Sequence, residues 1–235
     1  MAETLSTIIW SINERNALNQ IVVNAGKLVD MQSNRALYES VRDADMVNAD
    51  GMAVVWASKF LGDPLPERVA GIDLMIRLVE LSAKEGFKIF FFGAKEQVVS
   101  KVVDRYKAEY GENIVAGYRN GYYNKDEEEN IAKEIAASNA DILFVAITSP
   151  KKEIFLNRYK HILNIPFTMG VGGSFDVVAG ETKRAPVWMQ NLGLEWFYRF
   201  IQEPKRMWKR YLIGNTIFVY LIIKQKLGFY KNPFD

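Results

Sequence analysis

The sequence contains no cysteine and only one histidine among its 235 residues. Without cysteine the chain can form neither a disulfide bond nor a thiolate metal site, and it has no thiol nucleophile. A single histidine all but excludes a histidine-based metal cluster. We expect this histidine, His161, to be a surface or capping residue, because it follows Lys160 at a predicted helix end. The sequence therefore predicts no bound metal and no cofactor.

An excess of charge of one sign is also missing. The formal net charge is only +2, which argues against a nucleic-acid partner bound by neutralisation of phosphates. The first ten residues lack the basic segment and long apolar core of a secretory signal, so we expect a cytoplasmic protein. A composition of 49% hydrophobic and 25% charged residues suits one sizeable α/β domain, with or without an appendage.

Short apolar runs alternate with longer amphipathic segments along most of the chain. This alternation predicts a Rossmann-like parallel sheet flanked by helices. In the stretch 6–20, which shows no clean period, we place a helix only in the second half. The predicted strands cover residues 20–23, 44–49, 87–92, 113–117, 141–147 and 165–169. Helices are expected at 26–33, 35–42, 52–61, 72–85, 95–110 and 126–139, and after Pro150.

A glycine-rich segment, Gly170–Gly180, follows the last predicted strand. Ligands of open α/β sheets bind at the carboxyl ends of the strands. Glycine there lets the backbone approach a ligand, and the N–H groups of Gly172 and Gly173, with the Ser174 hydroxyl, are suited to phosphate oxygens. The alternative is an ordinary turn. The dipeptide Gly93–Ala94 also follows a strand, but it lacks the further glycines of a dinucleotide-binding motif, which disfavours a dehydrogenase.

Asp50 stands at the end of another predicted strand, directly before an apolar helix. The helix dipole favours the charged form of a carboxylate in this position. One interpretation of this carboxylate is a helix cap.

The stretch from Glu195 to Asp235 differs in kind from the rest. It interleaves aromatic residues with lysine and arginine, and its apolar run Leu212–Ile223 is shorter than the ~20 residues that span a bilayer. This pattern predicts a helix lying in the interface of an anionic membrane. The alternative is a helix packed on the domain with a solvated basic face. We therefore divide the chain into a Rossmann-like domain, 1–194, and a C-terminal appendage, 195–235.

Several short motifs stand out along the chain. They are Asn48–Gly51, Glu67–Asp73, Ser149–Glu153, Gly170–Asp176, Lys183–Pro186 and the tail from Leu194 through Glu203 and Pro204 to Arg206 and Arg210. Together these motifs resemble the WecG/TagA/CpsF family of bacterial glycosyltransferases. The resemblance extends from about residue 22 to about residue 211, and it includes the C-terminal appendage.

The resemblance implies a metal-independent glycosyltransferase. Such an enzyme moves a sugar from a UDP-sugar to an undecaprenyl-diphosphate-linked sugar at the cytoplasmic membrane face, in the synthesis of teichoic acid, capsule, exopolysaccharide or common antigen. The aspartate matching Asp50 is the implied general base, and the arginine matching Arg68 lies in the active site. Arginines of the appendage are implied to close over the site and meet the diphosphate. The residues expected to bind the donor or a diphosphate are Asn24, Lys152, Gly172, Gly173, Ser174, Asp176, Arg184, Arg199, Arg206 and Arg210.

Two positions depart from the family pattern. Val22 stands where a threonine is common, and Lys152 stands where a glutamine is common, so a hydroxyl is lost and a positive charge is gained. Lys152 is suited to an anionic donor sugar or to the diphosphate. The competing interpretation of the whole chain is a non-catalytic protein that binds nucleotides or lipid phosphates at the membrane. Association of the chain with copies of itself, as a homo-oligomer, is left open.

Overall fold

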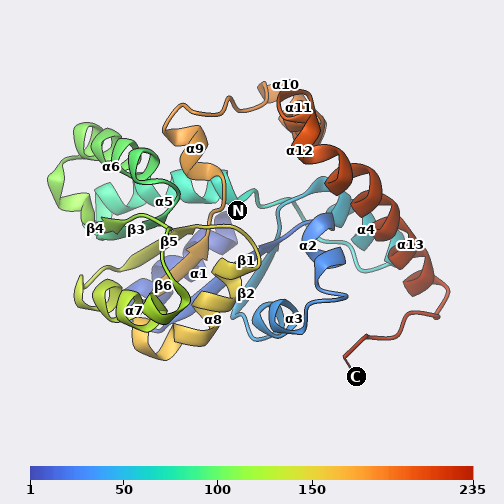
Figure 1. The fold of residues 1–235 in the computed structure, drawn as a ribbon, viewed down its shortest axis with the longest axis horizontal. Helices are drawn as coiled ribbons and strands as arrows, with labels where there is room; N and C mark the ends of the chain where they lie inside the picture. The colour runs from blue at the N-terminus through green and yellow to red at the C-terminus, as the bar shows by residue number, and fades with distance from the viewer. Residues whose placement is uncertain (235) are drawn as a thin grey trace. The chain divides into compact units, whose positions relative to one another are not determined.

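A computed structural model describes residues 1–234, apart from the side chains of Asn191, Arg206, Met207, Lys209 and Arg210 (Figure 1). Its six strands form one sheet in the order β2-β1-β6-β5-β3-β4, with parallel pairing of β1 to β6, β6 to β5, β5 to β3 and β3 to β4. This confirms the predicted Rossmann-like α/β fold. The strands are β1 Leu18–Val23, β2 Met46–Ala49, β3 Ile89–Gly93, β4 Val115–Arg119, β5 Ile142–Ala146 and β6 Phe167–Gly170.

The helices alternate with the strands as expected. They are α1 Ala2–Asn13, α2 Ala25–Asp30, α3 Arg35–Arg42, α4 Met52–Leu61, α5 Gly71–Glu85, α6 Glu96–Tyr110, α7 Glu128–Ala137, α8 Lys151–Leu163, α9 Ser174–Val178, α10 Val187–Asn191, α11 Glu195–Gln202, α12 Pro204–Trp208 and α13 Gly214–Lys226. Short 3-10 turns lie at Glu112–Ile114 and Lys125–Glu127, and a π-helical turn at Lys209–Ile213 joins α12 to α13.

The prediction for the first helix was wrong. The helix begins at Ala2 and ends at Asn13, so it occupies the part of the segment that we left unassigned. Its buried face contains Thr4 and Ser11 beside Ile8 and Ile12. These two polar residues interrupt the repeat of apolar residues by which a helix is recognised in a sequence. The Ser11 hydroxyl is nevertheless satisfied, because it donates to the backbone carbonyl of Pro166 at 3.0 Å.

The chain forms two compact units. The first unit comprises residues 1–21, 40–47 and 71–182, and the second comprises 22–39, 48–70 and 183–235. Strands β1 and β2 contribute residues to both. The division into domains 1–194 and 195–235 stays a prediction.

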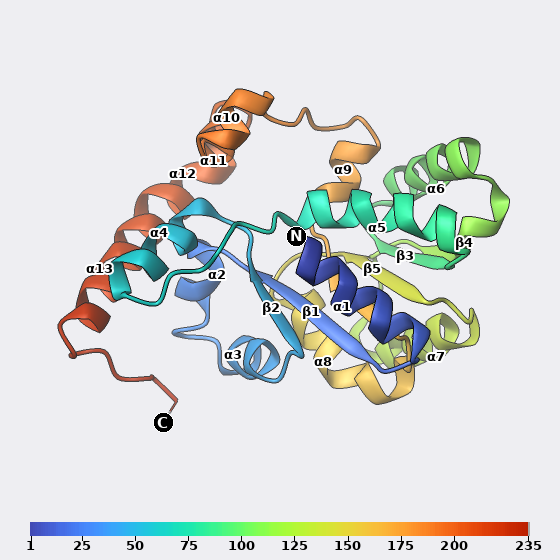
Figure 2. The same ribbon diagram turned by 180° about the vertical axis from the view of Figure 1, so that it is seen from behind.

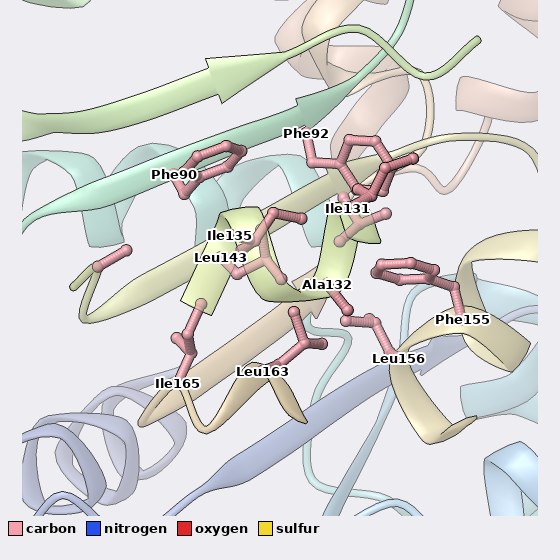
Figure 3. Close-up of a cluster of buried hydrophobic side chains, with 12 residues drawn as sticks. Phe90, Phe92, Ile131, Ala132, Ile135, Leu143, Phe155, Leu156, Leu163 and Ile165 are labelled. Atoms are coloured by element: carbon pink, nitrogen blue, oxygen red, sulfur yellow. The ribbon is translucent and has the colours of Figure 1, made fainter. Parts of the chain in front are cut away.

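Within the first unit, β3 and β5 are covered on both faces. Phe90, Phe92 and Leu143 point to one face and pack against α7 and α8 (Figure 3). Phe91 points to the opposite face, where its ring lies 5.8 Å from that of Tyr106 on α6. Figures 1 and 2 show α7 and α8 on one side of these strands and α1 and α5 on the other. Parallel strands require this double cover, and it explains their continuous apolar sequences.

Within the second unit, α13 packs on α2 and α4. Phe218 is buried in a cluster with Ala25 of α2 and Ala57 of α4. The segment beyond α13 is also attached to the unit, since the Tyr230 hydroxyl donates to Gln32 at 2.9 Å. No helix among the described residues combines the length and the apolar character needed to cross a membrane.

We predict that Phe218→Ala destabilises the second unit by about 3 kcal/mol, because it removes a buried aromatic side chain and leaves a cavity. Tyr220→Ala on the same helix is the matched control, since Tyr220 is 61% exposed. Urea denaturation, with hydrogen exchange of the α13 amides, measures both variants. Equal loss of stability in the two would contradict the packing of α13 described above.

Candidate active site

The glycine-rich segment leaves β6 through a left-handed turn. Gly172 has a φ angle of 54°, a conformation that glycine adopts with little strain. Within residues 1–234, neither the Gly172 N–H nor the Gly173 N–H donates a hydrogen bond to another part of the chain. The Ser174 hydroxyl is buried and donates to the carbonyl of Val171 at 2.8 Å. The turn therefore has main-chain N–H groups that can donate to a ligand, while the Ser174 hydroxyl is used in a hydrogen bond within the turn.

The segment after α9 is attached to α6 by polar contacts. Lys101 pairs with Glu181 at 2.6 Å, and this hydrogen bond lowers the pKa of the Glu181 carboxyl group. Arg105 donates to the carbonyl of Val178 at 3.0 Å. The Asp176 carbonyl accepts the N–H of Glu181 at 2.8 Å. These contacts hold the glycine-rich turn at the carboxyl end of β6.

Lys152 and Glu153 form a buried ion pair at the start of α8. Their charged groups lie 2.9 Å apart, and their side chains are only 8% and 2% exposed. The aliphatic part of Lys152 lies against Gly170, because a Cβ atom at that glycine would be 2.9 Å from Cδ and Cε of the lysine. Gly170 thus makes room for the lysine. The pair lies at the carboxyl ends of the neighbouring strands β5 and β6.

In the second unit, Asn24 and Asp50 follow the ends of β1 and β2. The Asn24 carboxamide caps α2 by accepting the N–H of Lys27 at 3.0 Å. The backbone N–H of Asp50 donates to the carbonyl of Val23 at 2.9 Å. A Cβ atom at Gly51 would lie 3.5 Å from Cβ of Asn24. The structure therefore brings the predicted base and Asn24 together.

Lys27 is a buried charge that the sequence analysis did not single out. Its side chain folds back so that Nζ donates to the carbonyl of Val22 at 2.5 Å, and the residue is only 6% exposed. A lysine in the first turn of the helix predicted at 26–33 was the available signal, but nothing local indicated that it turns inward.

Arg68 lies in the loop between α4 and α5. The next residue, Val69, donates its N–H to the carbonyl of Ala49 at 2.9 Å, which fixes the loop beside the end of β2. The Arg68 guanidinium pairs with the carboxylate of Glu195, the first residue of α11. Arg184 approaches the same carboxylate, with 3.6 Å between Nε and Oε1. Sequence reasoning placed the two arginines in the site but missed the glutamate that joins them.

The appendage arginines are only partly described. Arg199 is exposed on α11, and its carbonyl accepts the N–H of Glu203 at 3.0 Å. The side chains of Arg206 and Arg210 lie outside the part of the chain that the structure describes. Their proposed contacts with diphosphate stay predictions.

The predicted site residues thus belong to two groups, one in each unit. The first unit holds Lys152, Gly172, Gly173, Ser174 and Asp176. The second holds Asn24, Asp50, Arg68, Arg184 and the appendage arginines. Among the described residues, no group of three or more carboxylate or histidine side chains is arranged to hold a metal ion. Metal independence stays a prediction.

Comparison with known proteins identifies the family. The model of the glycosyl transferase WecG/TagA/CpsF family matches residues 1–232. The chain belongs to this family. It is 40% identical over 183 residues to an N-acetylglucosaminyldiphosphoundecaprenol N-acetyl-beta-D-mannosaminyltransferase of Bacillus spizizenii, an alignment covering 77% of this chain and 69% of the relative. A protein of the same name from Bacillus subtilis is 36% identical over 203 residues, covering 85% of this chain and 78% of that protein.

We predict that Gly170→Ala destabilises the first unit by about 1–3 kcal/mol, because the new Cβ atom displaces the buried Lys152 side chain. Gly214→Ala is the matched control, since a Cβ atom there meets nothing within 4 Å. Urea denaturation compares the two variants. Equal urea midpoints for Gly170→Ala and the unaltered chain would mean that the buried position of the Lys152 side chain does not require a glycine at residue 170.

Proposed function

We propose that this chain transfers an N-acetylhexosamine from a UDP-sugar to a polyprenyl-diphosphate-linked sugar in the synthesis of a cell-surface polysaccharide. The family match over residues 1–232 carries this proposal. The names of both relatives support a lipid acceptor of the type N-acetylglucosaminyldiphosphoundecaprenol. This chemistry has two demands, a base for the acceptor hydroxyl and stabilisation of the departing UDP.

Asp50 is the proposed general base. Its main chain is fixed by the hydrogen bond to Val23, and Gly51 forms the N-cap of α4 directly after it. The carboxylate takes the proton of the acceptor hydroxyl as that oxygen bonds to the anomeric carbon of the donor. The bond between this carbon and the β-phosphate oxygen breaks, and UDP leaves with the electron pair.

Arginine side chains and main-chain N–H groups are proposed to stabilise the departing diphosphate. A guanidinium group can bind two phosphate oxygens at once, which suits Arg68, Arg184 and the arginines of the appendage. The N–H groups of Gly172 and Gly173 are suited to the same charge. No step in this scheme passes through a metal ion.

Lys152 is proposed to contact the donor near the carboxyl ends of β5 and β6. Its charge is compensated by Glu153 at 2.9 Å, so the pair presents no net charge. This compensation favours a neutral donor sugar over an anionic one. The same conclusion is supported by the N-acetylmannosaminyl group in the names of both relatives.

The appendage is proposed to rest on the cytoplasmic face of the membrane, where the lipid acceptor is anchored. While Phe218 packs inward, much of the rest of α13 and of the segments on either side of it is apolar and exposed. The exposed apolar residues are Trp208, Leu212, Ile213, Ile217, Val219, Tyr220, Ile223, Leu227 and Phe229. Lysines at positions 224 and 226 add positive charge at the end of this helix, which favours anionic lipid.

We predict that Asp50→Asn lowers transfer at least about a hundredfold while UDP still binds, because the amide cannot accept the hydroxyl proton. The assay supplies a panel of UDP-N-acetylhexosamines and a short-chain lipid-diphosphate acceptor, and it reads UDP release and product mass. Asp63→Asn, in the exposed loop after α4, is the control. Full transfer by folded Asp50→Asn would exclude this residue as the base. Absence of transfer by the unaltered chain would favour a binding protein.

We predict that Leu212→Asp weakens binding to vesicles containing phosphatidylglycerol by about tenfold or more, because it removes apolar area and adds a negative charge. Tyr122→Asp in the first unit is the matched control, because both side chains are 69% exposed. Vesicle sedimentation measures both. Equal binding by the two variants would exclude this face of the appendage as the membrane contact.

A further inference from the structure

One carboxylate in the second unit is shared by two guanidinium groups. Oε2 of Glu195 meets Arg68, and Oε1 faces Nε of Arg184 at 3.6 Å. The side chains of Arg68, Glu195 and Arg184 are 16%, 23% and 24% exposed, respectively. All three are thus mostly shielded from water yet still reachable from solvent.

Each member of this cluster comes from a different segment of the chain. Arg68 is carried by the loop that Val69 attaches to the end of β2. Arg184 is carried by the segment before α10, where Gln202 of α11 donates to the carbonyl of Lys183 at 3.2 Å. Glu195 opens α11. The carboxylate therefore connects two separate loops to the start of the appendage.

The arrangement of charges has a direct physical reason. Two guanidinium groups held close together repel one another, and the repulsion grows where water is partly excluded. A shared anion removes this repulsion and keeps both groups in place. A carboxylate with one oxygen toward each guanidinium makes the same kind of charge-assisted contact that a phosphate group makes with arginine.

We propose that Glu195 is a stand-in for the substrate phosphate and that an arriving diphosphate replaces it between Arg68 and Arg184. The nature of this ligand rests on the proposed function. A diphosphate carries more negative charge than a carboxylate and offers more acceptor oxygens, so it competes effectively for both guanidinium groups. When the phosphate binds, Glu195 is repelled, and the first turn of α11 is released from the two arginines.

The test measures binding of UDP and of inorganic pyrophosphate to the full chain by isothermal titration calorimetry. Glu195→Gln keeps the side-chain shape and removes the competing charge. We expect it to tighten binding of both probes by about tenfold, equivalent to about 1.4 kcal/mol. In an Arg68→Ala background the same substitution has a much smaller effect, because one of the two contested cations is gone.

Glu39→Gln is the matched control, since Glu39 pairs with an arginine of the same unit at 2.8 Å. Equal tightening by this control would overturn the proposal, because it would show a general effect of net charge. Unchanged or weaker UDP binding by folded Glu195→Gln would also overturn it while leaving the proposed function intact. If pyrophosphate binding tightens but no variant binds UDP, the proposed anion site between Arg68 and Arg184 is supported and the proposed function fails. Failure of the unaltered chain and of Glu195→Gln to bind either probe would overturn both.

Discussion

The need to cover both faces of the parallel strands decides where this chain can place polar chemistry. In β3 and β5, alternate side chains point to α7 and α8 or to the opposite helices, and all of them are apolar and buried. Reactive groups are therefore displaced to the residues that follow the strands, where backbone and side chains meet solvent. The buried pair of Lys152 and Glu153 lies at such an end, and it is tolerated because each charge compensates the other.

The same constraint explains why the sheet was predictable from the sequence. A strand buried on both faces has a short continuous apolar run, as β3 and β5 have, whereas β2 and β4 at the edges of the sheet are only partly buried. Each of the six segments that we predict as strands overlaps a strand. The first helix was not predictable in the same way, since Thr4 and Ser11 lie on its buried face. The Ser11 hydroxyl lies within hydrogen-bond distance of the carbonyl of Asn16, at 2.6 Å, and of the carbonyl of Pro166, 155 positions away, at 3.0 Å. No local pattern contains the contact with Pro166.

The candidate site shows the same limit. Asp50 and the glycine-rich turn are indicated by their places after strands, and Arg68 by its motif. The partner of Arg68 is 127 positions away in the sequence, so neither spacing nor composition points to Glu195. Gly170 is similar, because the reason for a glycine there is the side chain of Lys152, which only the fold places against it. Residue types were predictable, whereas their pairing required the structure.

The appendage packs on the second unit, which is one of the two alternatives for it, while the membrane contact stays a proposal. One face of α13 packs on α2 and α4 through Phe218, and another face leaves apolar residues such as Val219 exposed. Two of its attachments differ in kind, because the contact at Phe218 is apolar while the contact at Glu195 is ionic. An incoming anion competes with an ionic contact and leaves an apolar one unchanged. Replacement of Glu195 by a diphosphate therefore releases the start of the appendage while α13 stays docked.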